Sequence, residues 1–420
     1  MPVDHLVVHI DTERGPVRAG DARFTVKPGR VATSFTYDGA YLSAAGSSKI
    51  DPHLELVSGA QHVDGMPGAF QDCSPDRWGR NLISKRIRAT EAREQRAARL
   101  ITDIDFLIGV SDITRQGALR FTEPGDGRFL GPGTDIPRLV SLPKLVHATS
   151  RLGRNADDHE AIKQLLDAGS GSLGGARPKA SVLDGDGRLL LAKFPHEGDD
   201  WDVMAWEMTA LDIADEAGIP TPSRQLVAVG DRSVLLLGRF DRAPGGRRVP
   251  YVSAMTLAHR RDGDHADVTD IADAISDHGS AVAADLEQIF RRSALSCAIH
   301  NTDDHLRNVG FLGSGPGWRL APIFDINPNP DPGAHRVTSI GAARSHADEP
   351  AGLALAGEHC RLTPAQMRSA LGDVRRAARR WPEHARRNGI PESEQRRFSP
   401  SFEAGLHVID SALIAIGQCD

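Results

Sequence analysis

The sequence predicts an α+β protein with a β-rich N-terminal region, a central region of mixed strands and helices, and a mainly helical second half. Three observations favour this order. Short β-branched and aromatic runs punctuated by glycine fill much of the first hundred residues. From about residue 137, apolar runs of strand length alternate with helical patterns. The second half carries stripes of apolar residues at helical spacing.

Composition and charge restrict the class of protein. Among 420 residues, 50 Lys and Arg face 56 Asp and Glu, and the net charge of −6 does not favour a chain that coats nucleic acid or anionic membrane. Hydrophobic residues at 40% exclude wholesale disorder. The sequence shows no apolar run of membrane-spanning length, no signal peptide, and no C-x-x-C pair among its four cysteines. We therefore expect a cytoplasmic protein without membrane contact, disulfide framework or zinc knuckle.

The N-terminal region, residues 1–125, is predicted to form a β-rich subdomain. Its expected elements are strands at 6–10, 30–37 and 41–43 and a helical stretch at about 76–100. A loop near 123–136 that contains Gly125, Gly127, Gly131, Pro132 and Gly133 marks the expected boundary after this region.

The remaining chain divides into a mixed region at 137–242 and a helical region at 243–420. The mixed region is expected to contain helices up to about 168, strands near 180–185 and 188–194, a helix from 201, and strands near 224–229 and 233–240. The helical region is expected to contain a long buried helix that ends near His300 and short strands near 309–313 and 318–323. One further helix is expected to begin at Thr363-Pro364, and a last amphipathic helix carries the stripe Leu406, Ile409, Leu413 and Ile416.

An acidic motif follows the long helix directly. Asp303 and Asn308 have the D-x-x-x-x-N spacing of a kinase catalytic loop, in which the Asp accepts the substrate hydroxyl proton and the Asn holds magnesium. Asp325 follows an apolar run farther along the chain, where a kinase-type fold needs a second carboxylate on the metal. Taken alone, the spacing is a weak signal, and a solvated turn at a helix end is its more common origin.

Lysine is rare in this chain, and two of its lysines stand in unusual settings. Only seven of the 50 basic residues are lysines, and none follows Lys193, which interrupts the apolar run 189–194. A lysine on a buried strand face needs an anionic partner, which nucleotide phosphates and Glu207 on the next helix would supply. The alternative is an edge-strand lysine that faces water.

A glycine-rich segment, residues 171–179, precedes that strand and ends at Lys179. Glycines allow positive φ and let backbone N–H groups approach phosphate oxygens. The segment matches neither of the two common glycine-rich phosphate motifs, so a surface loop is the alternative. The order of loop, strand lysine, helix glutamate and Asp/Asn/Asp is nevertheless that of a protein kinase, with its small lobe first.

The chain resembles the HipA family of bacterial toxin-type serine/threonine kinases over nearly its whole length. The motifs that carry the resemblance are Ser74-Pro75-Asp76-Arg77-Trp78-Gly79-Arg80, Gly117-Ala118-Leu119-Arg120-Phe121, Gly174-Gly175-Ala176-Arg177-Pro178-Lys179, Leu191-Ala192-Lys193-Phe194, Arg239-Phe240-Asp241-Arg242, Asn301-Thr302-Asp303-Asp304-His305-Leu306-Arg307-Asn308 and Phe324-Asp325-Ile326-Asn327-Pro328. The resemblance implies a two-lobed protein-kinase-like core of HipA type, with an N-terminal β-rich subdomain and a helical C-terminal lobe. One departure is Arg177-Pro178, where some members carry Gln-Glu.

The resemblance also implies cofactors and site residues. It implies ATP and Mg²⁺, with Asp303 as catalytic base and with Asn308 and Asp325 on the metal. Ser172 matches the family's autophosphorylated serine, and a phosphate there would repel ATP and expel the loop. The implied ATP-binding residues are Gly174, Gly175, Ala176, Arg177, Pro178, Lys179, Lys193, Gly238, Arg239, Phe240, His305, Phe324 and Asp325, with Glu207 in support.

The implied function is that of a toxin kinase which phosphorylates a protein serine, aminoacyl-tRNA synthetases being family examples of the substrate. The implied partner is a HipB-like helix-turn-helix antitoxin, through which DNA contact mainly occurs. The rival functions are a kinase-fold co-repressor that acts by binding the antitoxin, and a small-molecule phosphotransferase. Residue types alone also allow a metal-hydrolase site at His300, Asp303, Asp304 and His305, and a nucleic-acid patch instead of a solvated face at the arginines between 375 and 387.

Overall fold

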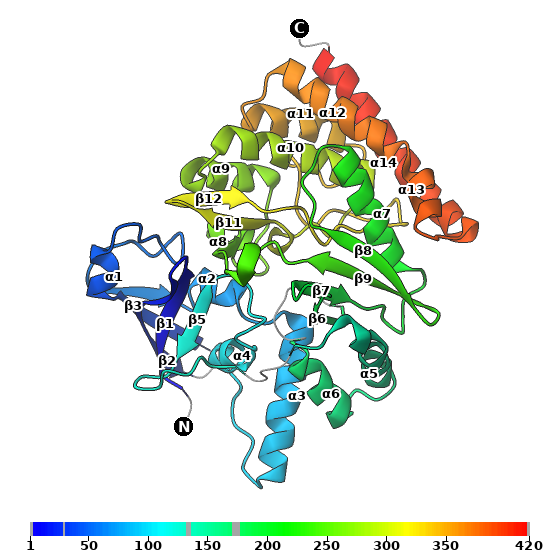
Figure 1. The fold of residues 1–420 in the computed structure, drawn as a ribbon. Helices are drawn as coiled ribbons and strands as arrows, with labels where there is room; N and C mark the ends of the chain where they lie inside the picture. Colours follow the sequence, from blue (N-terminus) through cyan, green and yellow to red (C-terminus); the bar gives the residue numbers. More distant parts are fainter. Residues whose placement is uncertain (1–2, 28–29, 132–135, 170–176, 418–420) are drawn as a thin grey trace. The chain divides into compact units, whose positions relative to one another are not determined.

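The computed structural model describes residues 3–27, 30–131, 136–169 and 177–417. The chain folds into two compact units (Figure 1). The first unit comprises Met1–Gly198 and Val227–Val252, and the second comprises Asp199–Leu226 and Ser253–Asp420. Each unit is therefore built from two separate stretches of chain.

The first unit begins with a five-stranded antiparallel sheet of order β4-β3-β2-β1-β5. Its strands are β1 (His5–Thr12), β2 (Gly15–Lys27), β3 (Arg30–Tyr37), β4 (Ala60–Asp64) and β5 (Leu119–Thr122). Phe35, Phe70 and Phe121 are fully buried and form edge-to-face pairs with ring centroids 6.4 and 5.2 Å apart. This aromatic core explains why the sheet forms from strands so far apart in the sequence.

The expected strand at 41–43 is wrong, because these residues belong to helix α1 (Gly39–Ser43). Asp38 caps this helix by accepting hydrogen bonds from the N–H groups of Ala40 and Tyr41. Tyr41 stacks on Tyr37 with ring centroids 5.8 Å apart. The aromatic residue that suggested a strand is therefore buried from a short capped helix.

The rest of the first unit is a sheet with helices packed on it. The helices are α2 (Gly68–Asp72), α3 (Arg77–Arg93), α4 (Asp103–Gly109), α5 (Leu142–Arg154) and α6 (His159–Asp167), with 3-10 turns at Leu139–Ser141 and Pro244–Gly246. The sheet order is β6-β7-β9-β8, formed by β6 (Lys179–Leu183), β7 (Leu189–Lys193), β9 (Arg232–Gly238) and β8 (Arg224–Val229), which contains one junction between the units. One sheet face and helices α3, α5 and α6 share an apolar core that includes Ile83, Leu165 and Phe194.

The second unit is mainly helical. Its elements are α7 (Val203–Glu216), α8 (Ala254–Leu257), α9 (Val268–His278), α10 (Val282–Ala298), β11 (Gly310–Ser314), β12 (Gly317–Leu320), α11 (Glu349–His359), α12 (Pro364–Ala378), α13 (Trp381–Arg387) and α14 (Glu392–Gly417), and β10 (Tyr251–Ser253) contains another junction. Helix α10 packs against α9, α11, α12 and α14. Its predicted apolar stripe is confirmed, because every member from Leu286 to Ala298 is at most 2% exposed.

Close packing around the end of α10 positions the loop that follows it. Gly405 of α14 lies against this end, where an added Cβ would meet the carbonyl oxygens of Cys297 and Ala298 at 2.4 and 2.5 Å. Nearer the start of α14, Phe398 stacks on Trp206 of α7 with ring centroids 3.9 Å apart. These contacts fix α14 against both α7 and α10.

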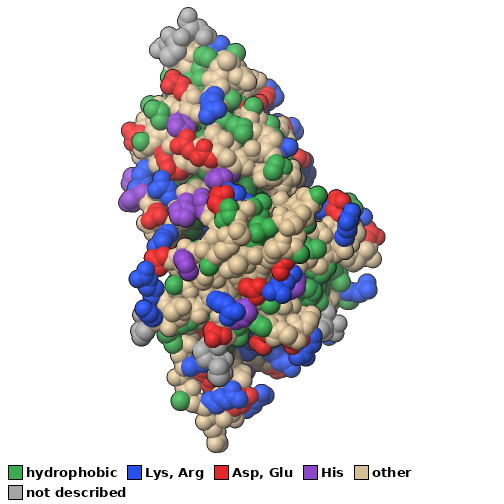
Figure 2. Space-filling view, turned by 90° about the vertical axis from the view of Figure 1, so that its left-hand side faces the viewer, with side chains coloured by type: hydrophobic (Ala, Val, Ile, Leu, Met, Phe, Trp, Pro, Cys, Tyr) green, Lys and Arg blue, Asp and Glu red, His purple; other side chains and the backbone are tan. Residues whose placement is uncertain are grey.

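Two surface properties bear on function. Within the described ranges, no helix combines the length and the apolar character that crossing a bilayer requires. On the face drawn in Figure 2, Lys and Arg side chains are interspersed with Asp and Glu side chains. That face therefore carries charges of both signs instead of one extended basic surface.

Candidate functional site

In the first unit, neighbouring strands carry three of the predicted nucleotide-binding positions. Lys179 of β6 pairs in register with Lys193 of β7, and Leu190 of β7 pairs with Gly238 of β9. Both lysines are buried, at 2% and 6% exposure. Sheet pairing thus places on adjacent strands positions that lie up to 59 residues apart in the sequence.

A carboxylate holds Lys179. The Nζ atom of Lys179 lies 2.5 Å from Oδ2 of Asp76, and the two side chains are 2% and 6% exposed. Asp76 is the N-cap of α3, where its Oδ1 accepts the Gly79 N–H at 2.7 Å. The Ser-Pro-Asp motif at the start of α3 therefore contacts the end of the glycine-rich segment. Both motifs were recognised in the sequence, but the ion pair between Asp76 and Lys179 was not predicted from it.

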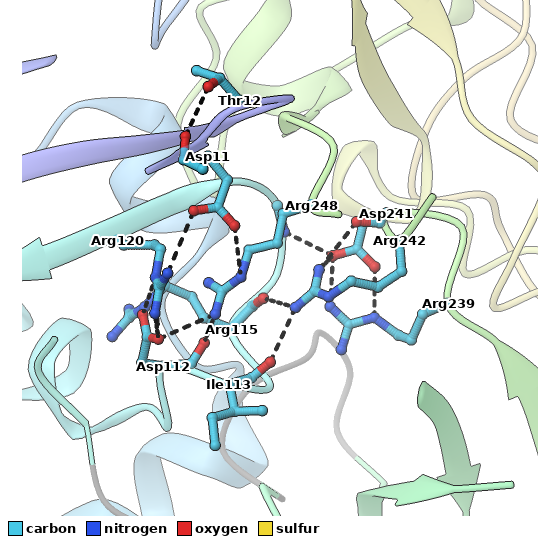
Figure 3. Close-up of polar contacts among 12 residues, drawn as sticks. Asp11, Thr12, Asp112, Ile113, Arg115, Arg120, Arg239, Asp241, Arg242 and Arg248 are labelled. Atoms are coloured by element: carbon cyan, nitrogen blue, oxygen red, sulfur yellow. Dashed lines mark hydrogen bonds and ion pairs between the residues drawn. The ribbon is translucent and has the colours of Figure 1, made fainter. Parts of the chain in front are cut away.

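The side chain of Arg239, one of the implied ATP-binding residues, makes its contacts within the protein. Its Nε and Nη2 atoms donate to the two carboxylate oxygens of Asp241, each at 2.6 Å (Figure 3). Its Nη1 atom donates to the Thr114 carbonyl at 3.0 Å. The same carboxylate accepts from Arg242 and from the Gly117 N–H, both at 2.8 Å. Burial opposes ionisation of Asp241, but the two arginines and the Gly117 N–H hold its pKa far below the usual range.

A second group of charges continues this network into the N-terminal sheet. Arg248 lies between Asp11 and Asp112 (Figure 3), at 3.5 Å from the first carboxylate and 3.1 Å from the second. Arg120 contacts the same two carboxylates at 3.5 and 2.5 Å. Buried and partly buried ion pairs therefore join the chain after β9 to β1 and to the segment before β5.

In the second unit, the end of α10 sets the path of the predicted catalytic loop. The His300 N–H bonds to the Cys297 carbonyl at 3.1 Å, and the Asn301 N–H bonds to the Ser296 carbonyl at 2.9 Å. This is the hydrogen-bond pattern of a Schellman motif, with His300 at φ = +53° where glycine is usual. Strain of this kind is common beside functional sites. The loop 301–308 starts at this turn.

The loop brings together the predicted catalytic and metal-binding residues. The side-chain amide of Asn308 donates to the Asp303 carbonyl at 3.0 Å, and the Asn308 N–H donates to the His305 carbonyl at 2.8 Å. Partial desolvation raises the pKa of Asp303; the negative charges of Asp325 and Asp304 add to this effect, and His305 acts against it. Asp325 therefore lies within electrostatic range of Asp303, and its own φ is +56°. Two carboxylates that repel each other favour a cation nearby.

A buried ion pair that sequence reasoning missed supports this loop. Arg336 and Glu349 are each 1% exposed, and Nε lies 2.5 Å from Oε1. Arg336 also donates to the Asn301 carbonyl at 2.9 Å, while His346 contacts the other Glu349 oxygen at 3.1 Å. Burial opposes ionisation of Glu349, but the His346 contact and the Arg336 charge lower its pKa to about 2. Asp304 is held separately by the Ser296 hydroxyl at 2.8 Å.

The remaining predicted residues are placed as follows. Ser172, Gly174, Gly175 and Ala176 lie outside the described residues. Pro178 is buried, and Arg177, Phe240 and Phe324 are half-buried. Glu207 is 1% exposed on α7 in the second unit, whereas Lys193 belongs to the first, so their pairing stays a prediction.

The geometry of the second unit favours neither a metal-hydrolase site nor a nucleic-acid patch. His300 directs Nε2 to the Asp331 carbonyl at 2.7 Å, and no group of three or more His, Cys, Asp or Glu side chains in the described ranges is arranged to hold a metal. Four carboxylates contact arginines of α12 and α13 and of the turns that follow α12: Asp410 with Arg375 and Arg379, Asp373 with Arg376, Glu383 with Arg380, and Asp212 with Arg387. This pairing is typical of a solvated helical face.

Comparisons with known proteins agree with this architecture. The family model of the HipA-like C-terminal domain matches residues 171–381, half of the chain, and that of the HipA N-terminal domain matches residues 18–103. No curated protein sequence matches the chain. A structure from Shewanella oneidensis MR-1, described as HipA, HipB and operator DNA of a toxin–antitoxin system, is 14% identical and superposes with a TM-score of 0.64 over 96% of both chains.

A second solved structure, the Helicobacter pylori proinflammatory kinase CtkA, is also 14% identical, with a TM-score of 0.43 over 57% of this chain and 94% of that one. The predicted mixed fold, with its β-rich N-terminal region and helical C-terminal region, is confirmed by the Shewanella superposition. One family model matches within the predicted N-terminal region, and the other matches across the predicted mixed and helical regions. The chain belongs to the HipA family.

Proposed function

We propose that this chain is an ATP- and Mg²⁺-dependent serine/threonine protein kinase that acts as the toxin of a toxin–antitoxin system. The observation that carries the proposal is the arrangement at the end of α10. There Asn308 is fixed to the backbone of Asp303, and Asp325 is close enough to oppose the ionisation of Asp303. This is the residue set that phosphoryl transfer uses: a base beside the nucleophile and two oxygen ligands for a metal.

Asp303 is the proposed base. As the substrate serine oxygen bonds to the γ-phosphorus, the bond to the β,γ-bridging oxygen breaks, ADP leaves, and the serine proton passes to the Asp303 carboxylate. Its pKa is raised from 3.8 by desolvation and by neighbouring carboxylates, which makes it a stronger proton acceptor than an ordinary Asp. A cation bound nearby would offset the repulsion and favour the carboxylate form that accepts the proton.

Asn308 and Asp325 are the proposed magnesium ligands. Both offer hard oxygen atoms, and Mg²⁺ takes few protein ligands because it keeps water and phosphate oxygens. The hydrogen bond from the Asn308 amide nitrogen to Asp303 turns the amide oxygen away from that carbonyl. When bound, the metal neutralises charge on the β- and γ-phosphates.

On the nucleotide side, we propose that Lys193 and Lys179 bind phosphate oxygens. Each is a buried ammonium group on a strand, and they occupy one cross-strand pair. A buried cation is costly unless an anion compensates it, and the triphosphate is a compensating anion in this proposal. The backbone at Gly238, Arg239 and Phe240 is proposed to meet the adenine, since the Arg239 guanidinium is occupied by Asp241.

We further propose a HipB-like, DNA-binding antitoxin as partner, and autophosphorylation at Ser172 as self-inactivation. The Shewanella structure that superposes on this chain is described as containing HipB and operator DNA. That likeness supports an antitoxin partner for this chain, with DNA contact through the antitoxin. The protein substrate is proposed by class only, with aminoacyl-tRNA synthetases as the first candidates for a screen.

The test incubates the purified chain with γ-labelled ATP and Mg²⁺, a panel of proteins that includes aminoacyl-tRNA synthetases, and a panel of small hydroxyl compounds. The proposal expects label in protein, on serine. Label only in small molecules would establish a small-molecule phosphotransferase instead. No transfer, together with tight binding to an antitoxin, would establish a kinase-fold co-repressor.

A further inference from the structure

One face of the β6–β7 hairpin carries three buried polar side chains at the end where Lys179 pairs with Lys193. Lys179 and Ser181 lie on the same face of β6, because side chains two residues apart share a face, and Lys193 is directly opposite Lys179 on β7. Ser181 is 0% exposed, and within the described ranges its hydroxyl has no hydrogen-bond partner. The other face is apolar and joins the core through Ala180, Val182, Ala192 and Phe194.

The two lysines repel each other in this arrangement. Directly opposed residues of antiparallel strands have Cβ atoms about 5 Å apart, and like charges at such positions are destabilising. Two buried ammonium groups together need at least one carboxylate in contact. Asp76 provides it from outside the sheet, at 2.5 Å from Lys179.

The Asp76 carboxylate is itself held rigidly. Its Oδ1 accepts the Gly79 N–H at 2.7 Å as the cap of α3, and its Oδ2 contacts the ammonium group. Each oxygen therefore has a separate partner, and α3 is anchored by Leu82 and Ile83, which are 2% and 0% exposed in the apolar core. The position of the Lys179 ammonium group is thereby set by a helix terminus.

We propose that Asp76 is a positioning residue for nucleotide binding. It fixes the Lys179 ammonium opposite Lys193, so that both cations are in place before the triphosphate arrives. The inference rests on the proposed function, in which these lysines bind ATP phosphates. Pre-placed charges contribute more to binding than charges that must first be ordered, because their conformational cost is already met in the free protein.

The competing explanation is that Asp76 only caps α3. Asn is as good an N-cap as Asp, so Asp76→Asn keeps the cap and removes the charge. Asp76→Ala removes both. Lys179→Gln and the double variant Asp76→Asn/Lys179→Gln complete a thermodynamic cycle. Asp103→Asn is the matched control, because Asp103 pairs with Arg80 in the same unit at 2.6 Å but is 48% exposed.

The experiment measures the Kd of MgATP by calorimetry and the melting temperature by circular dichroism for each full-length variant. We expect Asp76→Asn to weaken MgATP binding about tenfold, as loss of a supporting contact typically does. Asp76→Ala should melt at a lower temperature without further loss of affinity. In the Lys179→Gln background, Asp76→Asn should have no effect on Kd, and Asp103→Asn should bind as the wild type does.

Three results would overturn the inference. Unchanged affinity in Asp76→Asn leaves only the capping role, tighter binding means that the carboxylate competes with the phosphates, and equal losses in both backgrounds mean that Asp76 does not act through Lys179. If Asp76→Asn does not fold, the double variant decides: affinity equal to Lys179→Gln supports the inference, and weaker affinity overturns it. A wild-type chain that binds no MgATP would instead overturn the proposed function.

Discussion

Replacing Glu349 by Gln should destabilise the second unit and loosen the catalytic loop. The change keeps the size of the side chain and removes its charge, so Arg336 is left buried at 1% exposure without its carboxylate. Arg336 also holds the Asn301 carbonyl at the start of the loop. Removing one partner of a buried ion pair costs about 3–5 kcal/mol, because the remaining charge has no water to solvate it.

The pH dependence gives an independent magnitude. Folding lowers the pKa of Glu349 from 4.5 to about 2. A group whose pKa is lower in the folded state stabilises the fold above its unfolded pKa and loses that contribution as pH falls through the folded pKa. The difference corresponds to about 3 kcal/mol, present in full above about pH 4.5 and lost toward pH 2. The two estimates agree in size.

Urea unfolding of the wild type and of Glu349→Gln, followed by tryptophan fluorescence, measures this effect. Four of the five tryptophans lie in the second unit, so the signal reports mainly on it. The difference in unfolding free energy should be about 3 kcal/mol at pH 7 and shrink as pH approaches 2. Glu383→Gln is the control, since its pair with Arg380 is 56% and 50% exposed and should contribute little at either pH. A difference below about 1 kcal/mol at pH 7, or one that does not change with pH, would refute the reasoning.

Three further predictions concern nucleotide and metal. Asp325→Asn should abolish the strengthening of ATP binding by Mg²⁺ while leaving the melting temperature within a few degrees of the wild type; Mg²⁺-dependent binding that persists would exclude Asp325 as a ligand. Lys193→Met should weaken ATP binding by about 10–100-fold, measured by calorimetry, because an apolar side chain of similar length replaces the ammonium group; wild-type affinity would place this lysine outside the phosphate site. For Ser172, mass spectrometry after incubation with MgATP should detect phosphate, and Ser172→Asp should weaken ATP binding through charge repulsion; unchanged affinity in that variant would defeat the proposed switch.

Local patterns predicted most of the elements that position the site. The apolar stripe of α10, the end of this helix near His300 and the short strands β11 and β12 follow from residue patterns within short stretches of sequence. The same approach missed β2 and β4, which carry mixed polar residues. It also assigned a strand at 41–43. That assignment was wrong because the Asp38 cap favours a helix there and outweighs the β-propensity of a single Tyr.

In the candidate site, the sequence predicted the local motifs but not the distant partners that support them. Asp303 and Asn308 are five residues apart, so one local motif pointed to both, and the structure joins them by a hydrogen bond from the Asn308 amide to the Asp303 carbonyl. The partners that support the two predicted clusters are distant in sequence: Asp76 lies 103 residues before Lys179. Arg336 and Glu349 appear as ordinary surface charges in the sequence, and only tertiary packing makes them a buried pair. The roles of the site residues, the cofactors and the domain boundaries stay predictions.

The most direct test of the central claim is a single-turnover measurement of γ-phosphate transfer from MgATP by the purified wild type and by Asp303→Asn. Asn has nearly the same shape as Asp but cannot accept the serine proton. We predict transfer to serine by the wild type and a loss of at least about a hundredfold in Asp303→Asn, with an unchanged circular dichroism spectrum and unchanged ATP affinity. Equal rates for both proteins, or no transfer by the wild type to any protein, would contradict the assignment of this chain as a kinase that uses Asp303 as its base.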